Sequence, residues 1–127
     1  MRILPVLFIS MMLASLGAQQ EQQRPEALSC NRSAISAEER PRHRELSERL
    51  VAAVMEQSEL KNGYALRVDG GGMRLAEAAE WMERERKCCP FLVFELETNG
   101  RERDFWVRLT GPEGTKALLD QVFSQVR

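Results

Sequence analysis

The sequence contains few of the residues on which most enzyme active sites depend. Among its 127 residues there are one histidine and three cysteines. It has no Ser-His-Asp set, no zinc-protease motif and no dinucleotide-binding fingerprint, and its cysteines do not form a C-x-x-C motif. We therefore predict no catalytic residues of these kinds, and any chemistry must involve the three thiols and the single imidazole.

An excess of charge of one sign is also absent. The formal net charge is -1, and acidic and basic residues are interspersed along the chain. Nucleic-acid surfaces need clustered positive charge, so we expect no nucleic-acid partner. Interspersed charges are typical of solvated helix faces. The length, together with a hydrophobic fraction of 43%, suits one globular domain.

The N-terminus carries the one long apolar run, within "MRILPVLFISMMLASLGAQQ". Arg2 precedes an apolar stretch over residues 3–16, and the small residues Gly17 and Ala18 follow it. This pattern is typical of a secretory signal peptide, and the run is short for a membrane span. We predict a signal peptide over residues 1–18, no stable membrane anchor after its cleavage, and a location in the periplasm or outside the cell.

The predicted export changes how the cysteines should be interpreted. Residues 19–29 are polar and rich in Gln and Glu, so we predict a flexible leader there. Residues 30–127 then form the domain. Outside the cytoplasm, pairs of thiols tend to become disulfides. Because three is an odd number, at least one thiol is left over, modified or coordinated.

The first predicted helix spans residues 36–62. Ser36 and Glu39 have the spacing of a capping box, but Pro41 is too deep for the first helical position. Either a short turn precedes a helix that starts near Pro41, or the helix kinks there. The dipeptide Asn62-Gly63 is predicted to end it.

The remaining pattern predicts three strands and two helices. The predicted elements are a strand over 64–68, a helix over 73–88 that Pro90 ends, strands over 91–98 and 103–110 around Asn99-Gly100, and a last helix after Pro112. The order α-β-α-β-β-α predicts a single α+β domain with helices on one face of a small mixed sheet. If the strands 64–68 and 91–98 are parallel neighbours, the helix between them is a right-handed crossover.

The stretch "ERERKCCPFLVFEL" places adjacent thiols, Cys88 and Cys89, where the helical pattern becomes a strand pattern. One interpretation is structural: Cys30 forms a disulfide with Cys88 or with Cys89. Such a bond closes a loop of about 60 residues and stabilises the fold by a few kcal/mol. A bond between Cys88 and Cys89 themselves would need a strained eight-membered ring, so we do not predict it.

A second interpretation is a soft-metal or metalloid site. Thiolates prefer Cu(I), Hg(II), As(III) or Zn over hard cations. Cys88 and Cys89 would hold the ion, Cys30 would supply a third ligand, and His43 is the one available imidazole. Adjacent cysteines are not the usual zinc spacing. A histidine on an apolar helix face is more often a packing residue, and that alternative stays open for His43.

A third interpretation is thiol-disulfide exchange, in which the spare thiol of the pair attacks or resolves a Cys30 disulfide. The C-terminus of a helix raises the pKa of a thiol, which argues against a reactive Cys88. A buried, inert pair of small hydrophobic residues is the remaining alternative. The two tryptophans, Trp81 and Trp106, could line a ligand pocket, but we predict that they pack in the core or at its edge.

Two signatures make the chain resemble a known family. The pattern E-x-x-CCPF-x-x-F-x-L, then L-x-TGP-x-G-x-K, is matched by Glu85, Cys88, Cys89, Pro90, Phe91, Phe94 and Leu96, then Leu109, Thr110, Gly111, Pro112, Gly114 and Lys116. The upstream pattern C-N … EER-x-RH-x-x-L is matched by Cys30, Asn31, Glu38, Glu39, Arg40, Arg42 or Arg44, His43 and Leu46.

From Cys30 onward the chain thereby resembles a family of small, mostly uncharacterised bacterial proteins. Segments similar to its Cys-Cys stretch occur near or attached to heavy-metal-responsive regulators. The resemblance implies a shared fold more firmly than a shared function. Many members are cytoplasmic, so the signal peptide is a departure that argues against an intracellular regulatory role.

Overall fold

The structure, a computed structural model, describes residues 28–126. The predicted signal peptide and most of the predicted leader lie outside these residues. Within residues 28–126, no helix is both long and apolar enough to span a membrane.

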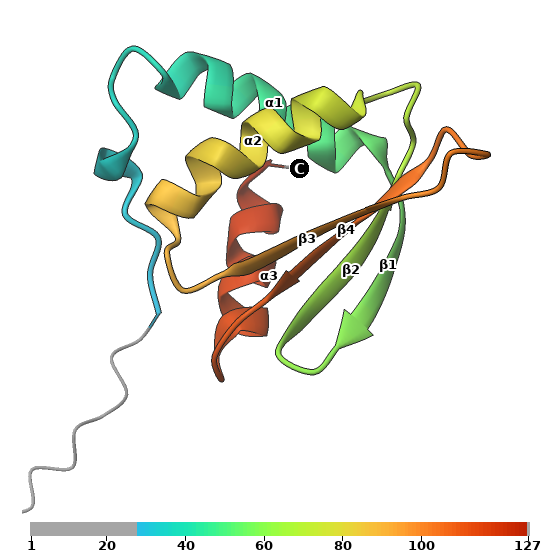
Figure 1. The fold of residues 1–127 in the computed structure, drawn as a ribbon. Helices are drawn as coiled ribbons and strands as arrows, with labels where there is room; N and C mark the ends of the chain where they lie inside the picture. Colours follow the sequence, from blue (N-terminus) through green and yellow to red (C-terminus); the bar gives the residue numbers. More distant parts are fainter. Residues whose placement is uncertain (1–27, 127) are drawn as a thin grey trace, which may run out of the picture.

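The described chain forms one α+β domain (Figure 1). Its helical elements are the short 3-10 helix η1 (Arg32–Ala34) and the α-helices α1 (Arg40–Ala53), α2 (Leu75–Cys88) and α3 (Thr115–Val126). Its strands are β1 (Val54–Leu60), β2 (Gly63–Val68), β3 (Val93–Thr98) and β4 (Phe105–Thr110). The predicted α+β class is confirmed, but the predicted order lacked β1.

The four strands form one sheet in the order β1-β2-β4-β3, and every neighbouring pair is antiparallel. The predicted mixed sheet is therefore wrong. β2 and β3 are not neighbours, because β4 lies between them and pairs Val107 with Leu66 on one side and Leu96 on the other. The physical reason is local: β1–β2 and β3–β4 each close as a hairpin, and the two hairpins then join through β2 and β4.

Strand β1 was missed because its sequence does not alternate clearly. Helix α1 ends at Ala53, nine residues before the predicted end, and β1 is mostly exposed at the edge of the sheet. Asn62 has a φ of 58°, so Asn62-Gly63 belongs to a tight hairpin turn and does not end a helix. A Cβ at Gly63 would collide with the carbonyl oxygen of Leu109 on the neighbouring β4, so the turn needs glycine there.

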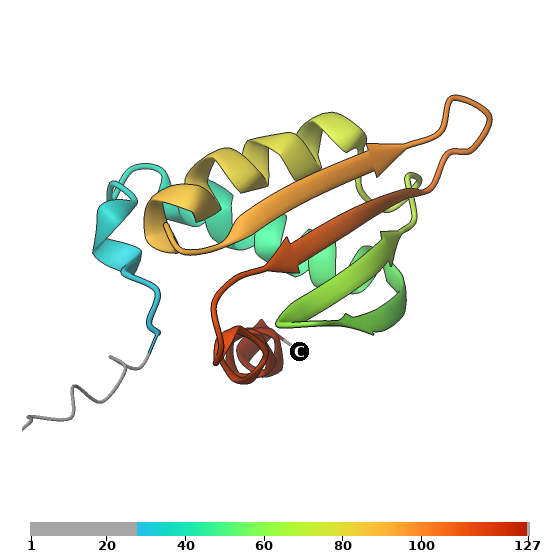
Figure 2. The same cartoon turned by 60° about the horizontal axis from the view of Figure 1, so that its bottom comes forward.

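One layer of helices covers one face of the sheet (Figures 1 and 2). Along β4, Phe105, Val107 and Leu109 are buried in the core, whereas the residues between them are half-buried on the other face. Helix α1 contributes Leu46 and Leu50 to the same core. The 3-10 helix η1 lies beside the C-terminal end of α2 (Figure 1).

Helix α2 buries a different stripe from the predicted one. Helical periodicity over residues 73–88 predicts a buried stripe of Leu75, Ala78, Ala79 and Met82. The buried residues of α2 are instead Glu77, Ala78, Trp81, Glu85 and Cys88. The prediction placed every glutamate on the wet side. Two of them instead lie inward, because α1 presents a polar partner for each. Trp81 is a core residue, as predicted, and its indole N–H donates to Ser47 Oγ at 3.0 Å.

Candidate functional site

The two adjacent cysteines occupy the last residue of α2 and the residue that caps it. Cys88 ends the helix, and Cys89 leaves helical geometry with φ -123° and ψ 71°. Pro90 explains this break, because the residue before a proline avoids the α region. The backbone N–H of Cys89 still donates to the Glu85 carbonyl at 2.8 Å, so the end of the helix is well formed.

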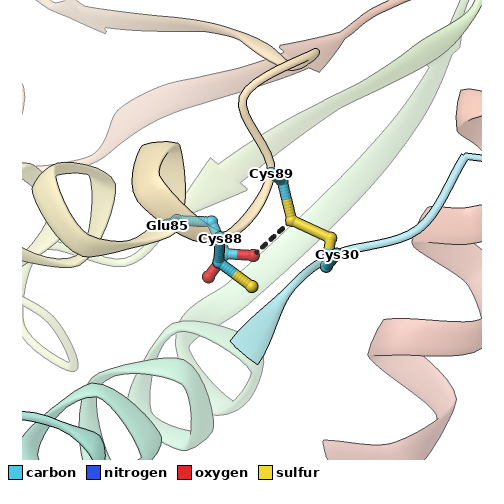
Figure 3. Close-up of side chains that lie close together, drawn as sticks. All are labelled: Cys30, Glu85, Cys88 and Cys89. Carbon is cyan, nitrogen blue, oxygen red and sulfur yellow. Dashed lines mark hydrogen bonds between the residues drawn. A yellow bond between two sulfur atoms is a disulfide. The ribbon is translucent and has the colours of Figure 1, made fainter. Parts of the chain in front are cut away.

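Cys89 is joined by a disulfide to Cys30, with a Cα separation of 4.7 Å (Figure 3). This separation lies within the usual disulfide range of about 4.4–6.8 Å. The two residues are 59 positions apart, so the bond ties the N-terminal segment to the end of α2. Next to it, the Asn31 N–H donates to the Cys88 carbonyl at 2.8 Å and satisfies a free helix-end group. Of the two pairings left open by the sequence, the structure contains the one with Cys89.

Cys88 is a free thiol beside this disulfide. It is 4% exposed. Burial, and secondly the negative charge of Glu85, raise the pKa of the Cys88 thiol to about 11, and Arg32 opposes this only in part. Cys88 is therefore a protonated thiol at neutral pH.

Glu85 lies between the disulfide and the histidine. Its Oε2 is 2.6 Å from Nε2 of His43. Its Oε1 is 3.4 Å from Sγ of Cys89 (Figure 3). A disulfide sulfur carries no hydrogen, so the sulfur–oxygen approach is a close contact in the oxidised protein. Once the disulfide is reduced, a Cys89 thiol in this position can donate a hydrogen bond to Glu85.

The sulfurs and Glu85 form one compact cluster. One oxygen of Glu85 and the sulfurs of Cys30, Cys88 and Cys89 all lie within 4.8 Å of one another. The predicted ligand His43 is not in this cluster. His43 instead contacts Glu85 through Nε2, at the carboxylate oxygen that is not the one near Cys89. The imidazole ring is roughly parallel to the ring of Trp81. The structure thus brings the three predicted cysteines together and places a carboxylate where an imidazole was predicted.

A cavity of about 370 Å³ opens beside the cluster. Its wall includes Cys30, Cys88, Glu85 and His43. The remaining wall comes from η1, Ile35, α1, Trp81 and α3. Cys89 is absent from the wall and has no exposed surface. The volume is typical of a site for a small molecule. A reagent in the cavity therefore meets Cys30 and Cys88, whereas Cys89 is shielded.

Glu85 is the site residue that reasoning from residue types missed. A glutamate in a stretch of alternating charges is usually solvated, and helical periodicity assigned Glu85 to the wet face. A signal did exist, because Glu85 opens the E-x-x-CCPF signature that carries the family resemblance. Its spacing of three and four residues from the cysteines places it over the last turn of the helix, next to both sulfurs.

No family model matches the chain, and none of the curated proteins or solved structures is significantly similar to it.

Proposed function

We propose that this protein is a thiol-disulfide exchange protein, and that Cys30–Cys89 is the disulfide that exchanges. One observation carries the proposal: the two sulfurs of the bond have opposite environments. Cys30 lies in the wall of a cavity, whereas Cys89 is fully buried against Glu85. Thiol-disulfide exchange depends on which sulfur can be attacked and on how well the other one leaves.

This asymmetry supports a defined direction of attack. An incoming thiolate in the cavity reaches Sγ of Cys30 and forms a mixed disulfide there. The Cys30–Cys89 bond breaks, and its electron pair passes to Sγ of Cys89. A second thiolate then attacks the mixed disulfide, which releases a small-molecule disulfide and leaves Cys30 reduced. The overall reaction consumes two thiols and yields one small-molecule disulfide and a protein dithiol.

Cys88 supports the same proposal by its protonation. A thiolate of Cys88 would lie close enough to attack Cys30 and move the disulfide from Cys89 to Cys88. With its pKa raised to about 11, however, Cys88 is almost entirely the unreactive thiol at neutral pH. The pairing of Cys30 with Cys89 is therefore kept until an outside thiol enters.

The test is reduction of the folded protein by dithiothreitol, followed by an acid quench, alkylation of all free thiols in denaturant, and mass spectrometry. We expect one alkylated thiol before reduction and three afterwards, while circular dichroism shows that the fold persists. Cys88→Ser is the matched control and should exchange as the parent does, from no alkylated thiol to two. A disulfide that opens only when the protein is unfolded would contradict the proposal and favour a purely structural bond.

A second candidate function is binding of a soft metal or metalloid by the reduced protein. The observation that favours it is the cluster itself: reduction would leave three thiols and a carboxylate within 4.8 Å of one another. Thiolates select soft ions, and binding would release their protons. In the oxidised protein two of the three sulfurs are bonded to each other, so binding would require prior reduction.

This second candidate is tested by titrating As(III) into reduced and oxidised protein. Binding by the reduced form alone, lost in the double variant Cys88→Ser/Cys89→Ser, would support it. Equal affinity in the parent and the double variant would refute it. Proton release measured in the same titration would show whether thiols are the ligands.

We also propose that the protein is exported and belongs to the family with the CCPF signature. A disulfide is typical of oxidising compartments, which supports export. The residues of the site, Cys30, His43, Glu85, Cys88 and Cys89, all belong to the two signatures that carry the resemblance. N-terminal sequencing of the mature protein tests export: we expect it to begin at Ala18 or Gln19, and a protein that retains Met1 would contradict it.

A further inference from the structure

We infer that Glu85, together with His43, is the proton donor and acceptor for the buried sulfur of Cys89. The inference rests on the proposed thiol-disulfide exchange and deepens it. It assigns a chemical role to a carboxylate that the attack on Cys30 does not itself use. When the disulfide opens, the pair supplies a proton to Cys89, and when it closes, the pair takes that proton back.

The geometry places both ends of this transfer within reach. Oε1 of Glu85 lies 3.4 Å from the sulfur that leaves, and Oε2 lies 2.6 Å from Nε2 of His43. The side chains of His43 and Glu85 are only 12% and 11% exposed. Nδ1 of His43 has no hydrogen-bond partner among residues 28–126, so Glu85 is the ring's one hydrogen-bond partner there. A contact of this length holds a hydrogen between the carboxylate and the imidazole.

The chemistry requires a proton at this position. Cys89 has no exposed surface, and a thiolate left in such surroundings is strongly disfavoured because it has lost its water. The carboxylate of Glu85 lies 3.4 Å from this sulfur, and its negative charge, which also raises the pKa of Cys88, would repel a thiolate. The departing sulfur therefore leaves more readily if a proton reaches it as the bond breaks, which is general acid catalysis.

Bonds, electrons and protons are all accounted for in this step. An incoming thiolate bonds to Sγ of Cys30, the Cys30–Cys89 bond breaks, and Sγ of Cys89 keeps the electron pair. One proton moves from the Glu85–His43 pair to Cys89 and gives a thiol. The pair then recovers a proton from water, and the oxidising direction reverses each of these transfers.

Other charged groups surround the pair and bear on its pH dependence. Cys88 lies on α2 beside Glu85, and Arg32 approaches from η1. From α1, Arg40, Arg44 and Glu48 line the same cavity, whereas the residues that α3 contributes, Val122 and Phe123, are apolar. None of these groups is placed between Glu85 and Cys89, so a change confined to Glu85 tests the transfer directly.

The decisive experiment compares the rate of disulfide reduction in the parent and in Glu85→Gln. Glutamine keeps the shape of the side chain but cannot supply the proton. The probe is dithiothreitol, at pH values from 5 to 9. Samples are quenched by acid and alkylated, and mass spectrometry then gives the fraction of reduced protein at each time. We expect Glu85→Gln to slow reduction about 100-fold, the lower end of the usual contribution of general acid-base catalysis, and to flatten its pH profile once the thiolate fraction of dithiothreitol is allowed for.

The matched control is Glu83→Gln. Glu83 lies on the same helix, is 74% exposed and makes only a loose ion pair with Arg86. We expect this variant to react within about twofold of the parent, since a remote surface charge does not take part in the proton transfer. If Glu85→Gln does not fold, Glu85→Asp replaces it in the test. Aspartate keeps the carboxyl group but is one methylene shorter, so the carboxyl lies further from Cys89. We expect Glu85→Asp to be reduced more slowly than the parent, with an unchanged pH profile.

The possible outcomes distinguish a failure of the proposed role of Glu85 from a failure of the proposed exchange function. Equal rates and equal pH profiles in the parent and Glu85→Gln would overturn the role of Glu85 while leaving the exchange function intact. If the disulfide of the folded parent is not reduced at any pH, the exchange function fails, and the role of Glu85 fails with it. A slow Glu85→Gln variant whose pH profile matches that of the parent would indicate a purely structural carboxylate and would also overturn the inference.

Discussion

Helix α2 buries a glutamate at each end, and the two carboxylates have very different partners. Glu77, in the first turn, receives the guanidinium of Arg49 at 2.7 Å and the backbone N–H of Arg74 at 2.9 Å. The Arg74 N–H bond, followed by the charge of Arg49, lowers the pKa of Glu77. Glu85, in the last turn, has an imidazole on one oxygen and a disulfide sulfur near the other.

The two buried carboxylates of this one helix therefore differ in role. Glu77 stabilises the structure, whereas Glu85 takes part in the proposed proton transfer. An arginine is always charged, and the N-terminus of a helix favours a negative charge, so Glu77 is a fixed anion that holds the start of α2 against α1. An imidazole can both donate and accept a proton, and a sulfur gains or loses a hydrogen when its redox state changes. Burial alone would not have distinguished these two sites, whereas their partners do.

Loss of the disulfide should have the largest effect and should destabilise the whole fold, because the cross-link limits the freedom of the unfolded chain. Cys30→Ser removes a cross-link between residues 59 positions apart. From the loop-closure entropy of the unfolded chain, this loss should lower the free energy of unfolding by about 4 kcal/mol. Urea unfolding of the oxidised proteins measures the free energy of unfolding. Cys88→Ser is the control, because it removes a thiol and keeps the disulfide. Equal losses in the two variants would show that the cross-link does not stabilise the fold.

The next largest effect concerns the free thiol. With its pKa raised to about 11 from 9.0, Cys88 should have roughly a hundredth of the thiolate of an ordinary cysteine at pH 7. Iodoacetamide should modify it about 100-fold more slowly than the same thiol in the unfolded chain. Mass spectrometry follows the reaction in the oxidised protein, where Cys88 is the free thiol. Modification at the unfolded rate would show that the folded environment does not suppress the thiolate.

The same pKa predicts the stability of the folded protein at high pH. Below pH 9 the thiol is protonated in both the folded and the unfolded chain, so its contribution is fully present. As the pH rises from 9.0 to about 11, the unfolded chain loses the proton first, and the folded state is progressively destabilised. Cys88→Ser should lack this loss, so the difference in stability between the variant and the parent should change across that interval.

A smaller effect is expected at the other end of the helix. Glu77→Gln should lower the melting temperature at pH 7 by a few degrees, because Arg49 loses its partner and the first turn of α2 loses its charge. Since the folded pKa of Glu77 is lowered, its contribution is present above pH 4.5 and is lost as the pH falls below that value. Melting curves of both proteins at several pH values should therefore converge in acid. Glu77→Gln should leave disulfide reduction unchanged, which sharpens the contrast with Glu85→Gln.

The smallest effect is predicted for Glu80, midway between the two sites. It accepts from Arg42 and then Arg84, which lower its pKa to about 2, but its side chain is still 35% exposed to solvent. Exposed ion pairs contribute little to stability because water and salt screen them. Glu80→Gln should therefore shift the melting temperature less than Glu77→Gln at pH 7. A larger shift would mean that the middle of the helix contact, and not its end, holds α1 against α2.

Signals that act over a few residues predicted much of this fold. Pro90 ended α2, and Asn99-Gly100 lies between β3 and β4, as the sequence indicated. Helix α1 begins next to Pro41, which agrees with one of the two alternatives left open. Strand β1 was lost because an exposed edge strand has little alternation, and its partner β2 supplies the hydrogen bonds that define it.

The site was predicted in its residues but not in its connections. The sequence identified the three cysteines as one candidate group, because the adjacency of Cys88 and Cys89 and a pattern typical of a signal peptide can both be recognised in the sequence alone. The choice of Cys89 over Cys88 depends on which sulfur the helix end directs at Cys30, and the role of Glu85 depends on a contact 42 residues away with His43. Contacts between distant segments are set by tertiary packing, which one sequence does not display.

The disulfide also divides the chain into a closed ring and a tail. The ring runs from Cys30 to Cys89 and contains α1, β1, β2 and α2, whereas β3, β4 and α3 form the tail. A protease that cuts once at exposed Lys61 leaves the two pieces in one covalent molecule, and they separate only after reduction. A cut at exposed Arg101, beyond the ring, divides the chain at once. Trypsin digestion with and without reductant therefore reports, on a simple gel, the fraction of molecules in which the bond is closed.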